Sequence, residues 1–224
     1  MTDAQAERDV PTRDTTHMHF DEAQAATLET ILRWRRDVRH FRTDPVDEAV
    51  LARLAEVMAL APSVGNARPW RVIRVADPAL RAAVRADFER CDMEAAADYA
   101  DDQAAAYRAL KLAGLDAAPV QLAVFTHIDP AEGHGLGRRT MPETLRQSTA
   151  MAIHTLWLAA RAANLGMGMV SILDPAEMER IFAVPEDWAF TAYLCLGHAE
   201  WDDDTPLLHR VGWQENAPTR WDVR

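Results

Sequence analysis

The run Arg-Arg-Asp-Val-Arg at residues 35–39 places three guanidinium groups around a single carboxylate. A guanidinium presents parallel N–H donors that match the oxygens of a phosphate group, and a carboxylate surrounded by cations stays ionised. The run is therefore typical of a site for a phosphorylated ligand with a polar reactive group beside it. A second interpretation is open, because cations also complement the dipole of a helix C-terminus and Asp37 can simply pair with a neighbour.

Two short motifs carry further polar groups next to glycines. In Ala-Pro-Ser-Val-Gly-Asn at residues 61–66, Ser63 offers a hydrogen bond and the glycine permits close approach of a ligand to the backbone. In Gly-Met-Gly-Met-Val-Ser at residues 166–171, Gly168 leaves room for a flat ring or a phosphate, and Ser171 can point at a ligand. Each motif also has a purely structural interpretation, as a helix stop with a turn and as a serine bonded to nearby backbone.

Several classes of site find no support in the sequence. The eight histidines and two cysteines show no metal-ligand spacing, so we expect no metal centre. We find no GxSxG elbow of a serine hydrolase, no GxxxxGK phosphate loop and no GxGxxG dinucleotide fingerprint. The formal net charge of -11 disfavours a nucleic-acid or anionic-membrane surface. An anion site must therefore be a local basic pocket.

The chain carries no targeting or membrane signal that we recognise. Its N-terminus lacks a basic-then-apolar pattern, and its apolar runs are too short to span a bilayer. Two cysteines without a disulfide framework suit a reducing compartment. We therefore expect a cytoplasmic protein.

Hydrophobic periodicity divides the chain into helices and strands. It predicts helices at about residues 21–34, 47–60, 143–163 and 176–182, and strands at about 70–75, 120–126, 168–173 and 190–196. Residues 1–19 are polar and without period, so we expect a flexible arm before a single domain at residues 20–224. Helices before and between the strands favour an α+β layered fold with a modest sheet.

Three other segments have their own signatures. The Ala-rich, charged stretch at residues 78–112 is predicted to be helical and broken near 95–102, whereas the Gly-rich residues 129–140 are predicted to form a loop. The tail from Trp201 holds three tryptophans among prolines and charges, a composition that favours packing on a partner surface. Together with the small residues in helix 143–163, the tail indicates a homodimer.

In this order, the motifs resemble the nitroreductase-like flavoprotein superfamily, and within it the BluB family of 5,6-dimethylbenzimidazole synthases. The resemblance covers about residues 31–213, and it is carried by residues 35–39 with Phe41, 61–65 with Pro69-Trp70, 107–112, 136–138, 156–162, 170–172 and 194–197. Single motifs are weak, but the ordered set is specific. The chain departs from the family pattern at Arg68, Met169 and Leu207.

The resemblance implies roles for the residues already described. Asp37 and Ser171 match the catalytic polar residues of the family. The predicted flavin-binding residues are Arg35, Arg36, Arg39, Ser63, Gly168 and Ser171. The family fold is a nitroreductase-like layered sheet with surrounding helices, and it forms a homodimer with flavin at the interface.

The resemblance also implies an unusual reaction, in which reduced FMN is the substrate rather than a recycled cofactor. Molecular oxygen reacts with it, and the flavin is fragmented to 5,6-dimethylbenzimidazole, the lower ligand of vitamin B12, and erythrose 4-phosphate. A flavin reductase is a candidate supplier of reduced FMN, and residues 78–112 would form a lid over the flavin. Two alternatives remain: an FMN-dependent NAD(P)H nitroreductase that keeps its flavin, and a non-enzymatic flavin-binding protein.

Overall fold

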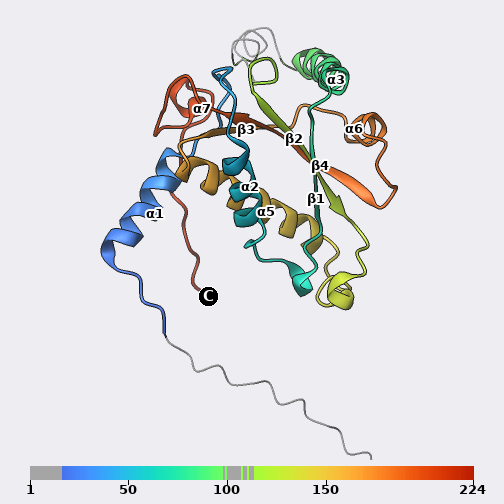
Figure 1. Cartoon of the computed structure of the whole chain (residues 1–224). Helices are drawn as coiled ribbons and strands as arrows, with labels where there is room; N and C mark the ends of the chain where they lie inside the picture. Colours follow the sequence, from blue (N-terminus) through green and yellow to red (C-terminus); the bar gives the residue numbers. More distant parts are fainter. Residues whose placement is uncertain (1–16, 98, 100–106, 108–109, 111–113) are drawn as a thin grey trace, which may run out of the picture.

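The computed structural model describes residues 17–97, 99, 107, 110 and 114–224 (Figure 1). Of the arm expected at residues 1–19, the last three residues are described, and they are exposed. Half of the break predicted near residues 95–102, and most of the second half of the expected lid, lie outside the described residues.

A four-stranded sheet forms the centre of the molecule (Figure 1). Its strands are β1 (Trp70–Arg74), β2 (Val120–His127), β3 (Gly166–Val170) and β4 (Trp188–Gly197). Their spatial order is β1-β2-β4-β3, and each neighbouring pair runs antiparallel. The central strands β2 and β4 are buried over most of their length, which explains their nearly continuous apolar sequences. The predicted α+β class is confirmed.

Helices cover both faces of the sheet. They are α2 (Glu48–Met58), α3 (Pro78–Ala97), α5 (Thr144–Ala162) and α6 (Pro175–Ile181). Strand side chains alternate between the faces, so Val124 and Leu194 pack on the side of α2 and α5, whereas Phe125 and Tyr193 pack on the side of α3 and α6. No helix in the described part of the chain is long and apolar enough to cross a membrane.

The helix α1 (Glu22–Trp34) and the C-terminal tail leave apolar side chains uncovered in the single chain. A capping box begins α1, because Asp21 accepts from the Gln24 backbone (2.8 Å) and the Gln24 side chain accepts from the Asp21 backbone (2.9 Å). None of the residues of α1 is buried. The tail contains a short helix, α7 (Leu207–Arg210), that the sequence did not predict, and beyond it Trp221 is 90% exposed.

The predicted element boundaries hold to within two residues, except for one strand. The strand predicted at residues 168–173 is wrong in position, since β3 starts and ends earlier. Its pairing with β4 ends after five residues, and the chain then leaves the sheet toward Asp174, whose side chain caps α6. The run Gly-Met-Gly-Met-Val lacks polar and apolar alternation, so periodicity alone cannot locate this strand.

Candidate active site

Residues 37–39 lie along the outer edge of β3, and we call them the edge strap. Three hydrogen bonds hold the strap: Val38 N to Met167 O (3.1 Å), Met169 N to Asp37 Oδ1 (2.9 Å) and Arg39 Nη1 to Met169 O (3.2 Å). Because β3 is an edge strand, its outer N–H and C=O groups need partners. The strap supplies them, and the same bonds fix the Asp37 carboxylate in place.

Two glycines of β3 make room for the strap. A Cβ built on Gly168 would lie 2.1 Å from the carbonyl oxygen of Val38, and one on Gly166 would lie 2.8 Å from a methyl group of the same residue. The interpretation that Gly168 leaves open room for a ring is therefore wrong, since Val38 fills that space. Glycines two apart in a strand point to the same face, and this spacing signals close approach by another segment.

The Asp37 carboxylate is partly desolvated and paired with Arg39. Burial raises the pKa of Asp37 above its usual value, although Arg39 and the N–H of Met169 act in the opposite direction, so the expectation that neighbouring cations alone set the charge of this carboxylate is wrong. The side chain is still 41% exposed by area, so it remains accessible from the cavity. A carboxyl group whose pKa is shifted toward neutrality is suited to proton transfer.

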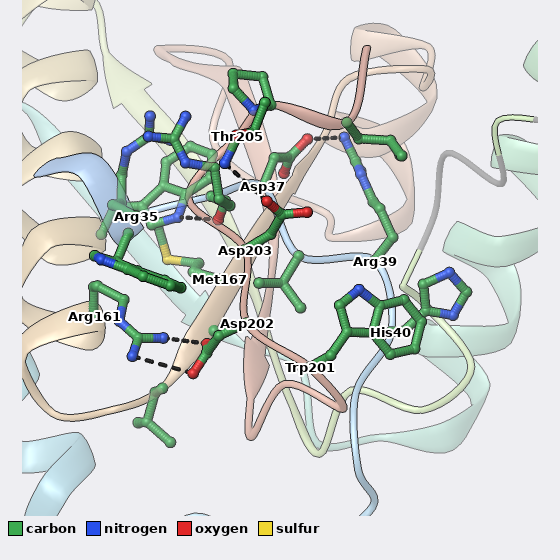
Figure 2. A pocket seen from close by; sticks show the side chains of 18 of the residues that line it. Arg35, Asp37, Arg39, His40, Arg161, Met167, Trp201, Asp202, Asp203 and Thr205 are labelled. Atoms are coloured by element: carbon green, nitrogen blue, oxygen red, sulfur yellow. Dashed lines mark hydrogen bonds and ion pairs between the residues drawn. The ribbon is translucent and has the colours of Figure 1, made fainter. Parts of the chain in front are cut away.

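A cavity of about 320 Å³ opens beside the strap (Figure 2). Its charged lining consists of Arg35, Arg36, Arg39, Arg161, Arg210, Asp37, Asp202 and Asp203. Five arginines and three aspartates leave a net charge of two positive. The indoles of Trp34, Trp157 and Trp201 add flat apolar surface. The local basic pocket expected from the acidic sequence is therefore present, and it contains the whole run at residues 35–39.

Arg35 and Arg36, the first two arginines of this run, make different contacts. The Arg35 guanidinium lies 4.8 Å from the centre of the Trp157 ring, a cation–π arrangement that places it at the cavity wall. Arg36 donates from Nε to the carbonyl oxygen of Arg33 (2.8 Å) at the end of α1. Burial, followed by repulsion from Arg35, lowers the pKa of Arg36. Arg36 therefore bonds the end of α1 and also lines the cavity, while Arg35 stands at the cavity wall against Trp157.

Ser63 lies away from this cavity. Its hydroxyl oxygen accepts from the backbone of Arg68 (3.0 Å), and the next residue, Val64, donates to Ser148 Oγ (3.0 Å) near the start of α5. Trp157, nine residues further along α5, lines the cavity. At about 1.5 Å per residue, these two positions are about 14 Å apart along the helix. One chain therefore does not bring Ser63 to the arginines.

The glycine of the Ser63 turn also has a structural role. A Cβ on Gly65 would lie 3.0 Å from the carbonyl oxygen of Gly133, which belongs to the short 3-10 helix η2 (Glu132–Gly135) in the Gly-rich loop. Gly65 has a φ of +55°, a backbone conformation that favours glycine. We expected a ligand to come close to the backbone at Gly65. On the side where a Cβ would stand, the protein's own Gly-rich loop takes that place.

Ser171 follows β3 directly and is exposed. It is two residues beyond Met169, the backbone partner of Asp37, so its Cα lies about 7 Å further along the chain. Ser171 does not line the cavity described above. The structure therefore brings both predicted catalytic residues to one end of β3 without direct contact between them.

Four charged residues of the cavity were not predicted as site residues: Arg161, Asp202, Asp203 and Arg210. Arg161 stands in the last turn of the amphipathic helix α5, which is an ordinary place for a cation. The aspartates belong to a run of three after Trp201, where they resemble a solvated loop. In the part of the chain that the structure describes, no three His, Cys, Asp or Glu side chains gather as a metal site.

The sequence is similar to one protein family and to curated relatives over most of its length. The model of the Nitroreductase family matches residues 32–198. The chain is 65% identical to a 5,6-dimethylbenzimidazole synthase of Rhodobacter capsulatus, over 92% of this chain and 100% of that protein. It is 52% identical to a 5,6-dimethylbenzimidazole synthase of Rhodospirillum rubrum, over 89% of this chain and 94% of that protein.

Solved structures share the fold at lower identity. An iodotyrosine deiodinase bound to FMN and 3-iodo-L-tyrosine superposes with a TM-score of 0.68 at 22% identity, covering 88% of this chain and 97% of that chain. A nitroreductase of Desulfitobacterium hafniense with bound FMN gives a TM-score of 0.58 at 21% identity, covering 78% and 89%. These likenesses establish the fold.

Proposed function

Because the chain belongs to the nitroreductase family, and within it to the 5,6-dimethylbenzimidazole synthases, we propose that it fragments reduced FMN with O2 to 5,6-dimethylbenzimidazole and erythrose 4-phosphate. The observation that carries this proposal is the 65% identity over the whole length of a synthase. The product is the lower ligand of vitamin B12, so the chain would serve cobalamin biosynthesis. A cytoplasmic location, as expected from the sequence, belongs to the same proposal.

The cavity residues fit a flavin mononucleotide. A phosphate monoester carries close to two negative charges at neutral pH, which the net charge of the cavity lining matches. Arg35 offers a guanidinium to such an anion, and its neighbour Trp157 offers a flat apolar face. Reduced FMN itself supplies the electrons that O2 accepts, so the protein needs only to bind, orient, shield and move protons.

Asp37 is the group that we assign to proton movement. Its position is fixed by the Met169 N–H, and its raised pKa lets the carboxyl group exchange a proton more readily near neutral pH than an ordinary aspartate does. Arg39 pairs with it and limits how far the pKa rises. We assign Ser171, at the same end of β3, to orienting the ring or a reactive oxygen by a hydrogen bond.

A homodimer with flavin at the interface is part of the proposal. Two features support it. Ser63 lies away from the arginines of the cavity in one chain, and a second copy can bring its Ser63 to a flavin that these arginines hold. The residues of α1 and Trp221 leave apolar surface uncovered. Light scattering should report twice the mass of one chain, and a monomer at micromolar concentration would contradict this part.

The product assay tests the central proposal. Purified protein is incubated with FMN, NADH, a flavin reductase and air, and 5,6-dimethylbenzimidazole is sought by mass spectrometry. We expect the benzimidazole to accumulate while FMN is lost. Recovery of unmodified FMN with no benzimidazole would overturn the proposal. A reaction without reductase is the control, because it also measures direct oxidation of NAD(P)H, the activity of the nitroreductase alternative.

A further inference from the structure

Two ion pairs engage arginines of the cavity: one joins α5 to the segment that follows Trp201 (Figure 2), and the other lies within that segment. Asp202 receives two bonds from Arg161, at 2.5 Å between Nη1 and Oδ1 and 3.4 Å between Nη2 and Oδ2. Asp203 pairs with Nη2 of Arg210 at 2.8 Å. The arginines that enlarge the basic pocket are therefore bound by the protein's own carboxylates.

The two aspartates are held to different degrees. Asp203 also accepts from the backbone of Thr205 (2.8 Å), and its side chain is 21% exposed. The Asp202 side chain is 51% exposed, and within the described residues its hydrogen bonds go to Arg161. Arg161 is the more enclosed partner, with 17% of its side chain exposed. Asp202 can thus leave its partner at the smaller cost.

A carboxylate and a phosphate bind a guanidinium in the same way, so the two groups compete for it. Both accept two parallel N–H bonds from an arginine, and a phosphate dianion brings more charge to the contact. The residue that a phosphate would meet at the end of α5 is Arg161, and Asp202 already holds that position. A phosphate that binds the same two nitrogens of Arg161, Nη1 and Nη2, therefore has to displace the carboxylate.

We propose that Asp202 is an internal competitor for the phosphate of the flavin, and that Arg161 is the residue for which they compete. The reason for such a device rests on the proposed function: if FMN is consumed, a phosphorylated product must leave after every turnover. Uniformly tight binding of a phosphate would slow that release without speeding the chemistry. An internal carboxylate lowers the affinity for the phosphate and leaves contacts to the ring unchanged.

The test compares FMN with riboflavin, which lacks the phosphate. Dissociation constants are measured by quenching of flavin fluorescence for the native protein and for Asp202→Asn, both checked for folding by circular dichroism. We expect Asp202→Asn to bind FMN about two- to fivefold more tightly and riboflavin equally well, because an ion pair with an exposed carboxylate contributes up to about 1 kcal/mol, which is about fivefold in a dissociation constant. Arg161→Met should weaken FMN binding and leave riboflavin binding unchanged.

A matched control separates this effect from a general change of surface charge. Asp44 pairs with Arg42 at 2.8 Å and is also 51% exposed, but neither residue lines the cavity. Asp44→Asn should leave both dissociation constants unchanged. The proposal is overturned if Asp202→Asn binds FMN with unchanged or lower affinity, or if its gain extends equally to riboflavin. Because binding is measured without turnover, a failed product assay would leave this result intact.

Discussion

Asp37 and Asp202 contribute carboxylates to the same cavity, but the protein holds them in different ways. Asp37 belongs to the edge strap, where a backbone N–H of β3 and Arg39 fix it and burial raises its pKa. Asp202 stands on an irregular segment, half exposed and bonded to one arginine. The comparison teaches that a hydrogen bond to the backbone keeps a carboxylate in a fixed position, which proton transfer requires. A half-exposed carboxylate that is bonded to one arginine can instead be displaced.

Replacing the fixed carboxylate should have the largest effect. Asp37→Asn keeps an acceptor for the Met169 N–H but removes the group that exchanges a proton, so benzimidazole formation should fall by about 100-fold or more. FMN binding, measured by fluorescence quenching, should change by only a few fold. A variant that forms product at the native rate would remove Asp37 from the chemistry, and Asp44→Asn again serves as the surface control.

Displacing the strap should be the next largest effect. Gly168→Ala drives a methyl group into the Val38 carbonyl, and we expect it to destabilise the protein by about 1–3 kcal/mol in urea denaturation. Gly166→Ala meets only the Val38 side chain, so adding Val38→Ala should restore its stability. The same addition should not restore Gly168→Ala, whose contact is with backbone. Equal rescue of both variants would contradict the strap geometry.

The raised pKa of Asp37 makes a signed prediction for stability. The folded protein keeps the proton on Asp37 at pH values where the unfolded chain has lost it, so stability contributed by the neutral carboxyl is lost as pH rises through the folded pKa. The Asp37→Asn variant does not lose stability in this way, because asparagine does not titrate. Its free energy of unfolding relative to the native protein should therefore increase from about pH 4 toward neutrality. A flat or opposite trend would show that Arg39 outweighs burial.

The smallest expected effect distinguishes the two aspartates of the tail segment. Asp203→Asn changes a carboxylate that is 21% exposed and also holds the Thr205 backbone N–H, and it should cost about 0.5–1.5 kcal/mol of stability. Asp202→Asn changes a carboxylate that is 51% exposed and bonded to Arg161, and it should cost less than about 0.5 kcal/mol. Thermal unfolding of both variants measures the difference. Equal losses would mean that Asp202 is held as firmly as Asp203, against its assignment as the removable carboxylate.

Much of the fold was predictable because it depends on local patterns. The capping residues around Asp21, the apolar periodicity of α5 and the apolar runs of β2 and β4 each act within a few residues. The site was partly predictable for the same reason, since the run at residues 35–39 is contiguous. Arg161 and Asp202 were not predictable, because they are 41 positions apart and each resembles an ordinary surface charge.

By itself, the sequence determined most of the helices and strands but not α7, which side chains are suited to binding phosphate and transferring protons, and which family the motifs resemble. These properties follow from side-chain chemistry and from spacing along the chain. Only the tertiary structure decided that Val38 fills the space beside Gly168, that Ser63 lies away from the arginines, and that the tail segment binds Arg161. Such contacts arise when distant segments fold against each other, and local pattern carries no information about which segments meet.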